Sequence, residues 1–61
     1  MAHVKVGSET LEGEGRIDSI MQSNGFYSDS FLYIMDGRPV PSDTEISDSQ
    51  AVEAIKVASG G

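Results

Sequence analysis

The chain has 61 residues, enough for one small domain, and a chain of this length buries only about 60% of the surface that its unfolded form exposes. Ten acidic and four basic side chains give a formal net charge of −6, which argues against nucleic acid or an anionic membrane as a partner. Cysteine is absent, which excludes disulfides, thiolate metal sites and a cysteine nucleophile. Because the sequence has neither a long apolar run nor an apolar leader segment, we expect a soluble, cytoplasmic protein.

The first twelve residues predict a β-hairpin. Residues 2–6 alternate between apolar and polar side chains with period two, which is typical of a strand with its apolar positions facing a core. Gly7-Ser8 is a turn signal, and residues 9–12 can return as an antiparallel strand with Leu11 inward. His3, at an outward position of the first strand, is expected to be a solvated side chain rather than a catalyst.

The pattern then changes to that of a helix over residues 16–24, with apolar residues at i, i+3 and i+4 from Ile17. Gly15 is expected to be the N-cap, and Asn24-Gly25 supplies a left-handed stop. A nine-residue helix is too short to be stable in isolation, so its apolar stripe must be held against a sheet. The glycine-containing segment 13–18 lacks the third glycine and the Walker lysine of a phosphate-binding loop, so a turn and a cap are expected there.

Two further strands are expected after a connection, residues 26–30, whose aromatic side chains should pack beneath the end of the helix. Residues 31–35 are all apolar or aromatic, which predicts a strand covered on both faces. Asp36-Gly37 predicts a two-residue hairpin turn, because Asp-Gly is a preferred sequence for turns that need positive φ. Residues 38–41 contain two prolines, which lack the N–H that a ladder needs, and therefore predict a short edge strand.

The remaining chain consists of an acidic loop and a final strand. In residues 42–50, Ile46 is expected to plug the open end of the core. The acidic residues of this loop match no twelve-residue calcium loop and lack its glycine, so we expect them to be solvated; they are Asp43, Glu45 and Asp48. Residues 52–57 are rich in β-branched side chains and predict the last strand.

This order of elements predicts an α+β fold of the β-grasp, ubiquitin-like class. The first strand can pair in parallel with the last one, because the helix between them forms a right-handed crossover. The result is a mixed sheet of four to five strands with one short helix packed on one face. We expect residues 1–58 to form this domain and residues 59–61 to form a flexible tail.

The tail ends in Gly60-Gly61, two residues without a Cβ, so a partner can enclose their backbone in a narrow channel. A terminal carboxylate is a poor electrophile at neutral pH. An outside enzyme would have to activate it, for instance as a mixed anhydride with AMP, before a sulfur or amine nucleophile could take the acyl group. The alternative interpretation is that Gly60-Gly61 is a frayed chain end or a remnant of cloning.

Three features together carry a resemblance to a known family. They are Asp36-Gly37-Arg38-Pro39-Val40-Pro41 followed by an acidic loop, the strand Val52-x-Ala54-Ile55-x-Val57, and Gly60-Gly61. In these features the chain resembles the ubiquitin-like sulfur carriers ThiS and MoaD, and it is most similar to the small archaeal modifier proteins (SAMPs). It departs from the usual pattern between residues 12 and 30, where it is compact and has a short helix.

The resemblance implies a carrier or modifier that is the substrate of an enzyme and is not itself an enzyme. In the family, an E1-like activating enzyme of the ThiF/MoeB type adenylates the terminal glycine, which is then joined to a lysine of a target protein or converted to a thiocarboxylate with a sulfur donor. By position, Gly61 is the residue that is adenylated, conjugated or thiocarboxylated, Gly60 keeps the tail thin, and Ser59 and Ala58 lie in the enzyme's channel. No bound cofactor or metal is expected, since ATP is consumed by the activating enzyme, and the protein is expected to be a monomer.

The strand patterns also predict a docking surface. If the odd-numbered residues of 31–35 point beneath the helix, the even-numbered ones point outward, and alternation in the last strand turns two more apolar residues to the same side. The predicted partner-docking patch consists of Leu32, Ile34, Ile55 and Val57. The opposite parity, or a covering loop, is the alternative. Lys5 and Lys56 are the candidate acceptor lysines for chain formation.

Three hypotheses follow for the function. The first is a ubiquitin-like protein modifier that doubles as a sulfur carrier, and the second is a dedicated sulfur carrier of the ThiS/MoaD type. The third is a β-grasp binding module that never reacts and acts through its surface alone. Self-catalysis is disfavoured, because the sequence has no cysteine and no cluster of histidine with carboxylates.

Overall fold

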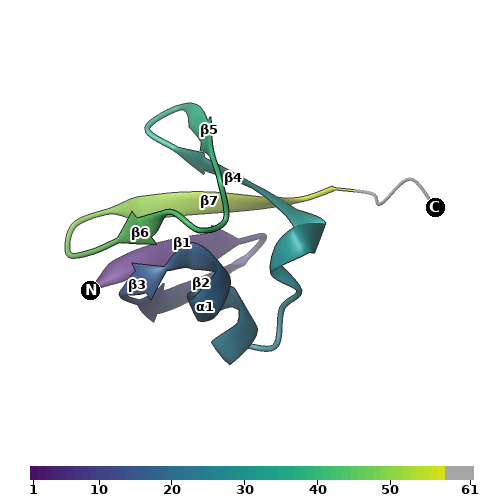
Figure 1. Ribbon diagram of the computed structural model, residues 1–61, viewed down its shortest axis with the longest axis horizontal. Coiled ribbons are helices and arrows are strands. Elements are labelled where there is room, and N and C mark those ends of the chain that lie inside the picture. Colours follow the sequence, from purple (N-terminus) through teal and green to yellow (C-terminus); the bar gives the residue numbers. More distant parts are fainter. Residues whose placement is uncertain (58–61) are drawn as a thin grey trace.

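A five-stranded mixed sheet, with one short helix across one of its faces, organises the chain in a computed structural model that describes residues 1–57 (Figure 1). The strands follow in the spatial order β2-β1-β7-β4-β5. The helical segments and the strands of the main sheet in this α+β fold are β1 (Ala2–Val6), β2 (Glu9–Gly13), α1 (Ile17–Ser23), the 3₁₀ turn η1 (Ser28–Ser30), β4 (Phe31–Met35), β5 (Arg38–Val40) and β7 (Ala51–Lys56).

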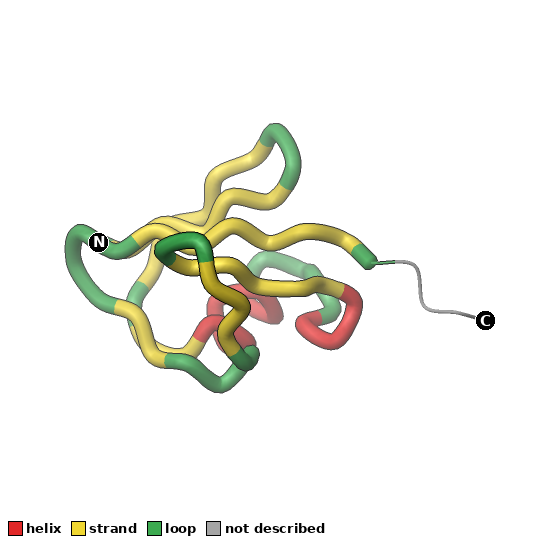
Figure 2. Tube along the Cα trace, turned by 90° about the horizontal axis from the view of Figure 1, so that it is seen from above, coloured by secondary structure: helices red, strands yellow, loops and turns green. Residues whose placement is uncertain are grey.

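The centre of the sheet is the parallel pair formed by β1 and β7, in which Val4 lies opposite Val52. The β1–β2 hairpin adds β2 on one side of this pair. The β4–β5 hairpin lies on the other side, where β4 pairs antiparallel with β7 (Figure 2). Asp36 and Gly37, both with positive φ, form the turn of the second hairpin. The predicted mixed sheet and the parallel pairing of its first and last strands are therefore confirmed.

The core lies between the helix-side face of the sheet and α1. The inward positions predicted for β1, β2, β7 and the helix are all buried, and Ile46 closes the open end of the core as expected. The buried apolar residues are Ala2, Val4, Val6, Leu11, Ile17, Ile20, Met21, Tyr33, Ile46, Val52 and Ala54.

The start of α1 corrects one prediction, because Arg16 and not Gly15 occupies the N-cap position. Gly15 and Arg16 are extended and pair with the acidic segment. The first two amides of the helix donate hydrogen bonds to the carbonyls of Thr44 (3.0 Å) and Ser42 (2.9 Å). These distant backbone acceptors replace the side-chain cap that a helix start usually needs, so the identity of the N-cap residue matters little here.

The acidic segment is also more ordered than expected. It contains a short strand, β6 (Glu45–Ile46), which pairs antiparallel with β3 (Gly15–Arg16) in a separate two-stranded sheet. The prediction of a loop over residues 42–50 was therefore wrong at Glu45–Ile46, although the side chains of Asp43, Glu45 and Asp48 are exposed as expected. Ile46 is the reason, since its burial brings the neighbouring backbone close enough to β3 to pair with it.

The end of α1 follows the predicted stop and aims one aromatic ring at the core. The N–H of Gly25 donates to the carbonyl of Gln22 (3.1 Å) and that of Phe26 donates to Met21 (3.0 Å), which is a Schellman motif. Phe26 packs against the core as expected, whereas Tyr27 is 82% exposed, so the prediction that both aromatics lie beneath the helix was wrong for Tyr27.

Strand β4 corrects another expectation, since it is covered on one face alone. Tyr33 is buried under the helix and its hydroxyl donates to the carbonyl of Ser28 (2.7 Å), while Leu32 on the other face is exposed. The absence of alternation in residues 31–35 thus reflects an apolar residue that points into solvent.

The buried hydroxyl of Tyr33 makes stability depend on alkaline pH. Burial raises the pKa of Tyr33, with a further contribution from Asp18 and Asp29. Above about pH 10 the unfolded chain can ionise this tyrosine while the folded chain resists, so stability present below the unfolded pKa is lost as pH rises. In urea unfolding between pH 8 and 11, we expect Tyr33→Phe to be less stable than wild type at pH 8 by about 1 kcal/mol, and to lose less stability on going to pH 11. Parallel pH profiles of the two proteins would contradict this.

Candidate functional site

The open face of the sheet, which is the face turned away from α1, carries an apolar patch on β4 and β7. Leu32 lies directly opposite Ile55 in the antiparallel register, and each side chain is 44% exposed. Val57 is 41% exposed beyond the end of β7, and Ile34, two residues after Leu32 on β4, is partly exposed. The parity that the sequence suggested is therefore the one observed. We call Leu32, Ile34, Ile55 and Val57 the apolar patch.

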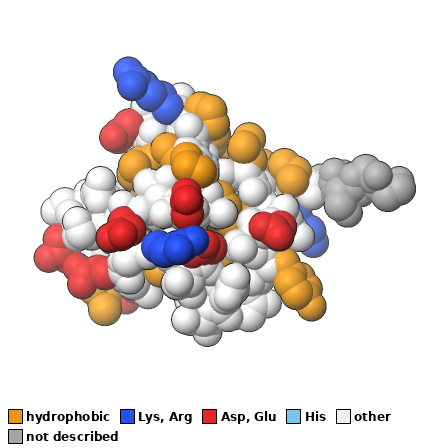
Figure 3. All heavy atoms as spheres, viewed as in Figure 1, with side chains coloured by type: hydrophobic (Ala, Val, Ile, Leu, Met, Phe, Trp, Pro, Cys, Tyr) orange, Lys and Arg blue, Asp and Glu red, His pale blue; other side chains and the backbone are white. Residues whose placement is uncertain are grey.

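The apolar patch lies where the described chain stops. The N–H of Val57 donates to the carbonyl of Ser30 (3.0 Å), so pairing with the segment before β4 continues past the last residue of β7. Figure 3 shows hydrophobic side chains along the surface that leads to this point. Residues 58–61, and with them the predicted domain boundary and the predicted site residues Ala58, Ser59, Gly60 and Gly61, lie outside the described residues.

The other half of the open face is polar. On β1 and β2, His3 lies opposite Glu12, and its Nε2 is 3.2 Å from a carboxylate oxygen of that residue. Lys5 neighbours Glu53 across the parallel pair, and Glu53 is in turn opposite Ile34. Glu53 thus separates the polar half of the face from the apolar patch. His3 has a cross-strand partner that the sequence did not suggest, because residues 3 and 12 meet only through the hairpin register.

The charged groups with shifted pKa values lie away from the apolar patch. The Met1 amine is 2.5 Å from Asp48, which raises the pKa of the amine and lowers the pKa of the Asp48 carboxyl. Arg16 donates to Asp18 at 2.7 Å, which raises the pKa of the guanidinium. Exposed pairs of this kind contribute little to stability. Over residues 1–57, no group of three or more His, Asp or Glu side chains is placed to hold a metal ion.

The two candidate acceptor lysines are both on exposed positions of the sheet. Lys5 lies on β1, next to Glu53 of β7. Lys56 is the last residue of β7 and lies opposite Phe31. An outside enzyme could reach either ammonium group from solvent.

The structure has a second surface, a hollow on the helix-side face, that the sequence did not suggest. Its lining includes Val6, Phe26, Phe31 and Ala54, all of which were assigned to the core or to a connection. The difference in length between the helix and the strands could have revealed it. A helix of seven residues spans about 10 Å, whereas strands of five or six residues span about 17–20 Å, so the helix leaves part of the sheet uncovered.

No family model matches the chain, and a search of curated proteins finds no relative. Within the described part of the chain, no helix is long and apolar enough to span a membrane.

Matched glutamate substitutions on β7 test the two faces. Ile55→Glu places a charge in water and should cost about 1 kcal/mol or less, the value of one cross-strand pair. Val52→Glu buries an unpaired charge beneath the helix and should cost several kcal/mol. Urea denaturation of both variants measures the difference. Equal losses of stability would show that the open face is covered in solution.

Proposed function

We propose that this chain is a ubiquitin-like protein modifier with a β-grasp fold, related to the small archaeal modifier proteins. The carboxyl group of Gly61 is adenylated by an E1-like enzyme of the ThiF/MoeB type and conjugated to target lysines. The same adenylate serves as the precursor of a thiocarboxylate when a sulfur donor captures it.

The topology supports the β-grasp assignment. A hairpin, a crossover helix and a second hairpin surround a central parallel pair of strands, and the helix lies across one face of the resulting sheet. These are the features from which the sequence predicted that architecture.

The observation that carries the proposal is the position of the apolar patch. Two exposed side chains that face each other across β4 and β7, Leu32 and Ile55, are followed by exposed Val57 at the end of the described chain. Exposed apolar residues that cluster on one face of a small protein mark a surface for a partner. An enzyme docked on the apolar patch would have the segment Ser59-Gly60-Gly61 within reach.

The proposed chemistry requires no catalytic group of this chain. The Gly61 carboxylate attacks the α-phosphorus of ATP on the activating enzyme, which forms the acyl adenylate and releases pyrophosphate. A lysine amine then displaces AMP to form an isopeptide bond and loses a proton, or hydrosulfide supplied by a sulfur donor displaces AMP and loses its proton to give a thiocarboxylate. What the chain supplies is a docking surface and a tail thin enough for a narrow channel.

Substitutions in the tail test the activation step. With the activating enzyme and ATP, deletion of Gly61 or the change Gly60→Val should abolish ATP–pyrophosphate exchange, because neither variant presents a thin tail of the right length. Ser59→Ala is the matched control, since it keeps a small side chain, and it should retain activity. The circular dichroism spectrum and melting temperature should be unchanged in all three variants. Normal exchange by Gly60→Val would contradict the channel argument.

Mass spectrometry of the protein from its native cell separates the three hypotheses. A modifier leaves remnants of Ser59-Gly60-Gly61 on lysines of other proteins, whereas a carrier shows replacement of oxygen by sulfur at Gly61. We expect conjugates, with Lys5 and Lys56 examined as sites of chain formation. A thiocarboxylate without conjugates would replace the modifier with a dedicated sulfur carrier, and the absence of both would favour the non-reacting binding module.

A further inference from the structure

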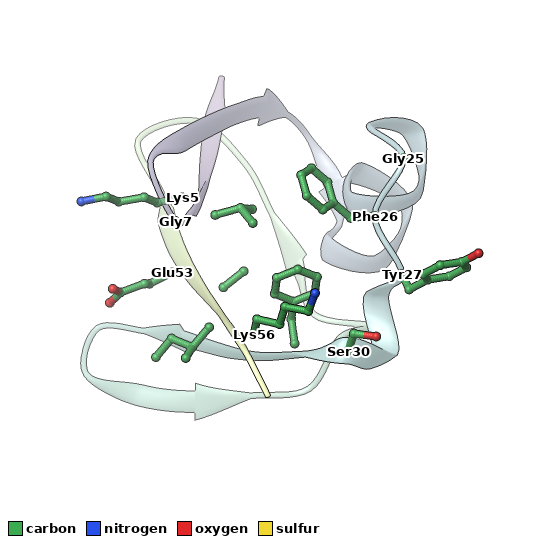
Figure 4. Close-up of a pocket in the computed structure, with 12 residues that line it drawn as sticks. Lys5, Gly7, Gly25, Phe26, Tyr27, Ser30, Glu53 and Lys56 are labelled. Carbon is green, nitrogen blue, oxygen red and sulfur yellow. The ribbon is translucent and has the colours of Figure 1, made fainter. Parts of the chain in front are cut away.

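The helix-side face has an opening at the end of the sheet where β7 stops. Val6 and Ala54 line it from the sheet, and the rings of Phe26 and Phe31 line it from the side, with their centroids 5.8 Å apart and their planes at 84°. The opening exists because α1 is shorter than the strands that it covers. We call it the apolar groove (Figure 4).

Backbone rather than bulky side chains forms two of the edges of the apolar groove. Gly7, in the turn between β1 and β2, and Gly25, after the helix, both line it. Both have positive φ, and a Cβ at either position would meet no neighbouring atom within 4 Å. The edges therefore leave room for a side chain to enter from solvent.

The charge at the apolar groove differs from that of the rest of the protein. Two of the four basic residues of the chain, Lys5 and Lys56, line it, although the net charge is −6. Figure 4 shows that the side chains of Lys5 and Glu53 point away from the hollow, whereas Lys56 extends over it. An anionic group that approaches the groove thus finds an exposed ammonium group beside an aromatic surface.

We infer that the apolar groove binds an acidic, aromatic segment of a partner protein. The aromatic ring packs against Phe26 and Phe31 above Val6 and Ala54, and a neighbouring carboxylate pairs with the Nζ of Lys56. Edge-to-face contacts suit a third ring at this site. Tyr27 is 82% exposed and its ring points away from the hollow in Figure 4, so a partner that extends beyond the opening can contact it on the neighbouring surface.

A protein segment fits the apolar groove better than a small metabolite does. A metabolite site usually encloses its ligand and orients it with several polar groups that converge on it. The apolar groove is open to solvent, and Lys56 is the cationic group that extends over it. Because these contacts are few, a ligand must gain most of its affinity from surface beyond the groove. A protein can do so, because its contacts continue over Tyr27 and the neighbouring surface.

This inference goes beyond the proposed function and does not depend on Gly61. The apolar groove opens on the helix-side face, and Ile55 is the one residue of the apolar patch that also contributes to its lining. Failure of either proposal leaves the other intact. Binding to the groove can be measured without activation or conjugation of Gly61. A variant truncated after residue 57 should therefore bind the same ligands as the full chain.

The experiment is a titration of ¹⁵N-labelled protein with two matched dipeptides, followed by ¹H–¹⁵N correlation spectra. One is acetylated and amidated phenylalanyl-aspartate, and the other is the same compound with asparagine in place of aspartate. We expect the acidic dipeptide to bind with a Kd of about 1–10 mM, as for a small, exposed ligand. It should shift the amides of Gly7, Gly25, Phe26 and Ala54, and the asparagine dipeptide should bind about two- to fivefold more weakly.

Lys56→Gln and Lys5→Gln are the matched variants. Both remove one exposed ammonium group, so both should fold normally. Lys56→Gln should abolish the preference for the acidic dipeptide, while Lys5→Gln should leave most of it, because Lys5 points away from the hollow. Four results would each overturn the inference. Wild type could bind both dipeptides equally, or show no amide shifts up to 20 mM dipeptide. The shifts could be confined to the apolar patch, or they could change with the protein concentration and not with that of the dipeptide.

Discussion

The parallel pairing of β1 with β7 is the constraint on which the rest of the structure depends. Parallel strands cannot be joined by a tight turn, so the chain between them must cross over, and α1 is carried across one face as a result. β2 then adds on one side of the central pair and the β4–β5 hairpin on the other. Val4 and Val52, which are neighbours in this pair, are among the most deeply buried side chains. The last strand therefore lies in the middle of the sheet.

This central position gives the end of β7 a different environment on each face of the sheet. On the open face, Leu32, Ile55 and Val57 expose apolar surface that nothing in residues 1–57 covers. On the helix-side face, α1 stops short and leaves the apolar groove between Phe26 and Phe31. A chain of 61 residues has little material with which to cover both faces. The two exposed apolar surfaces thus share one cause, which is a sheet larger than the rest of the chain can cover.

Charge distinguishes the two surfaces further. The acidic segment uses its backbone carbonyls to hold the start of α1 and its buried Ile46 to close the core, which leaves its carboxylates in solvent. The net charge of −6 makes the electrostatic field of the molecule as a whole negative. Lys56 is placed instead over the apolar groove, where it favours an acidic segment. A partner that approaches the apolar patch and one that enters the groove would therefore differ in charge.

The amino-acid sequence alone determined the elements that depend on local physics. Period-two alternation identified β1, the spacing from Ile17 identified the helix, and Asp36-Gly37 identified the second hairpin, because neighbouring residues decide each of these. The chemistry proposed for Gly61 also rests on sequence. The tertiary structure decided the pairing of β3 with β6, the N-cap at Arg16, the outward direction of Leu32 and the apolar groove. Each of these depends on contacts between segments far apart in the chain, and an uninterrupted apolar run such as 31–35 carries no periodicity from which its register could be deduced.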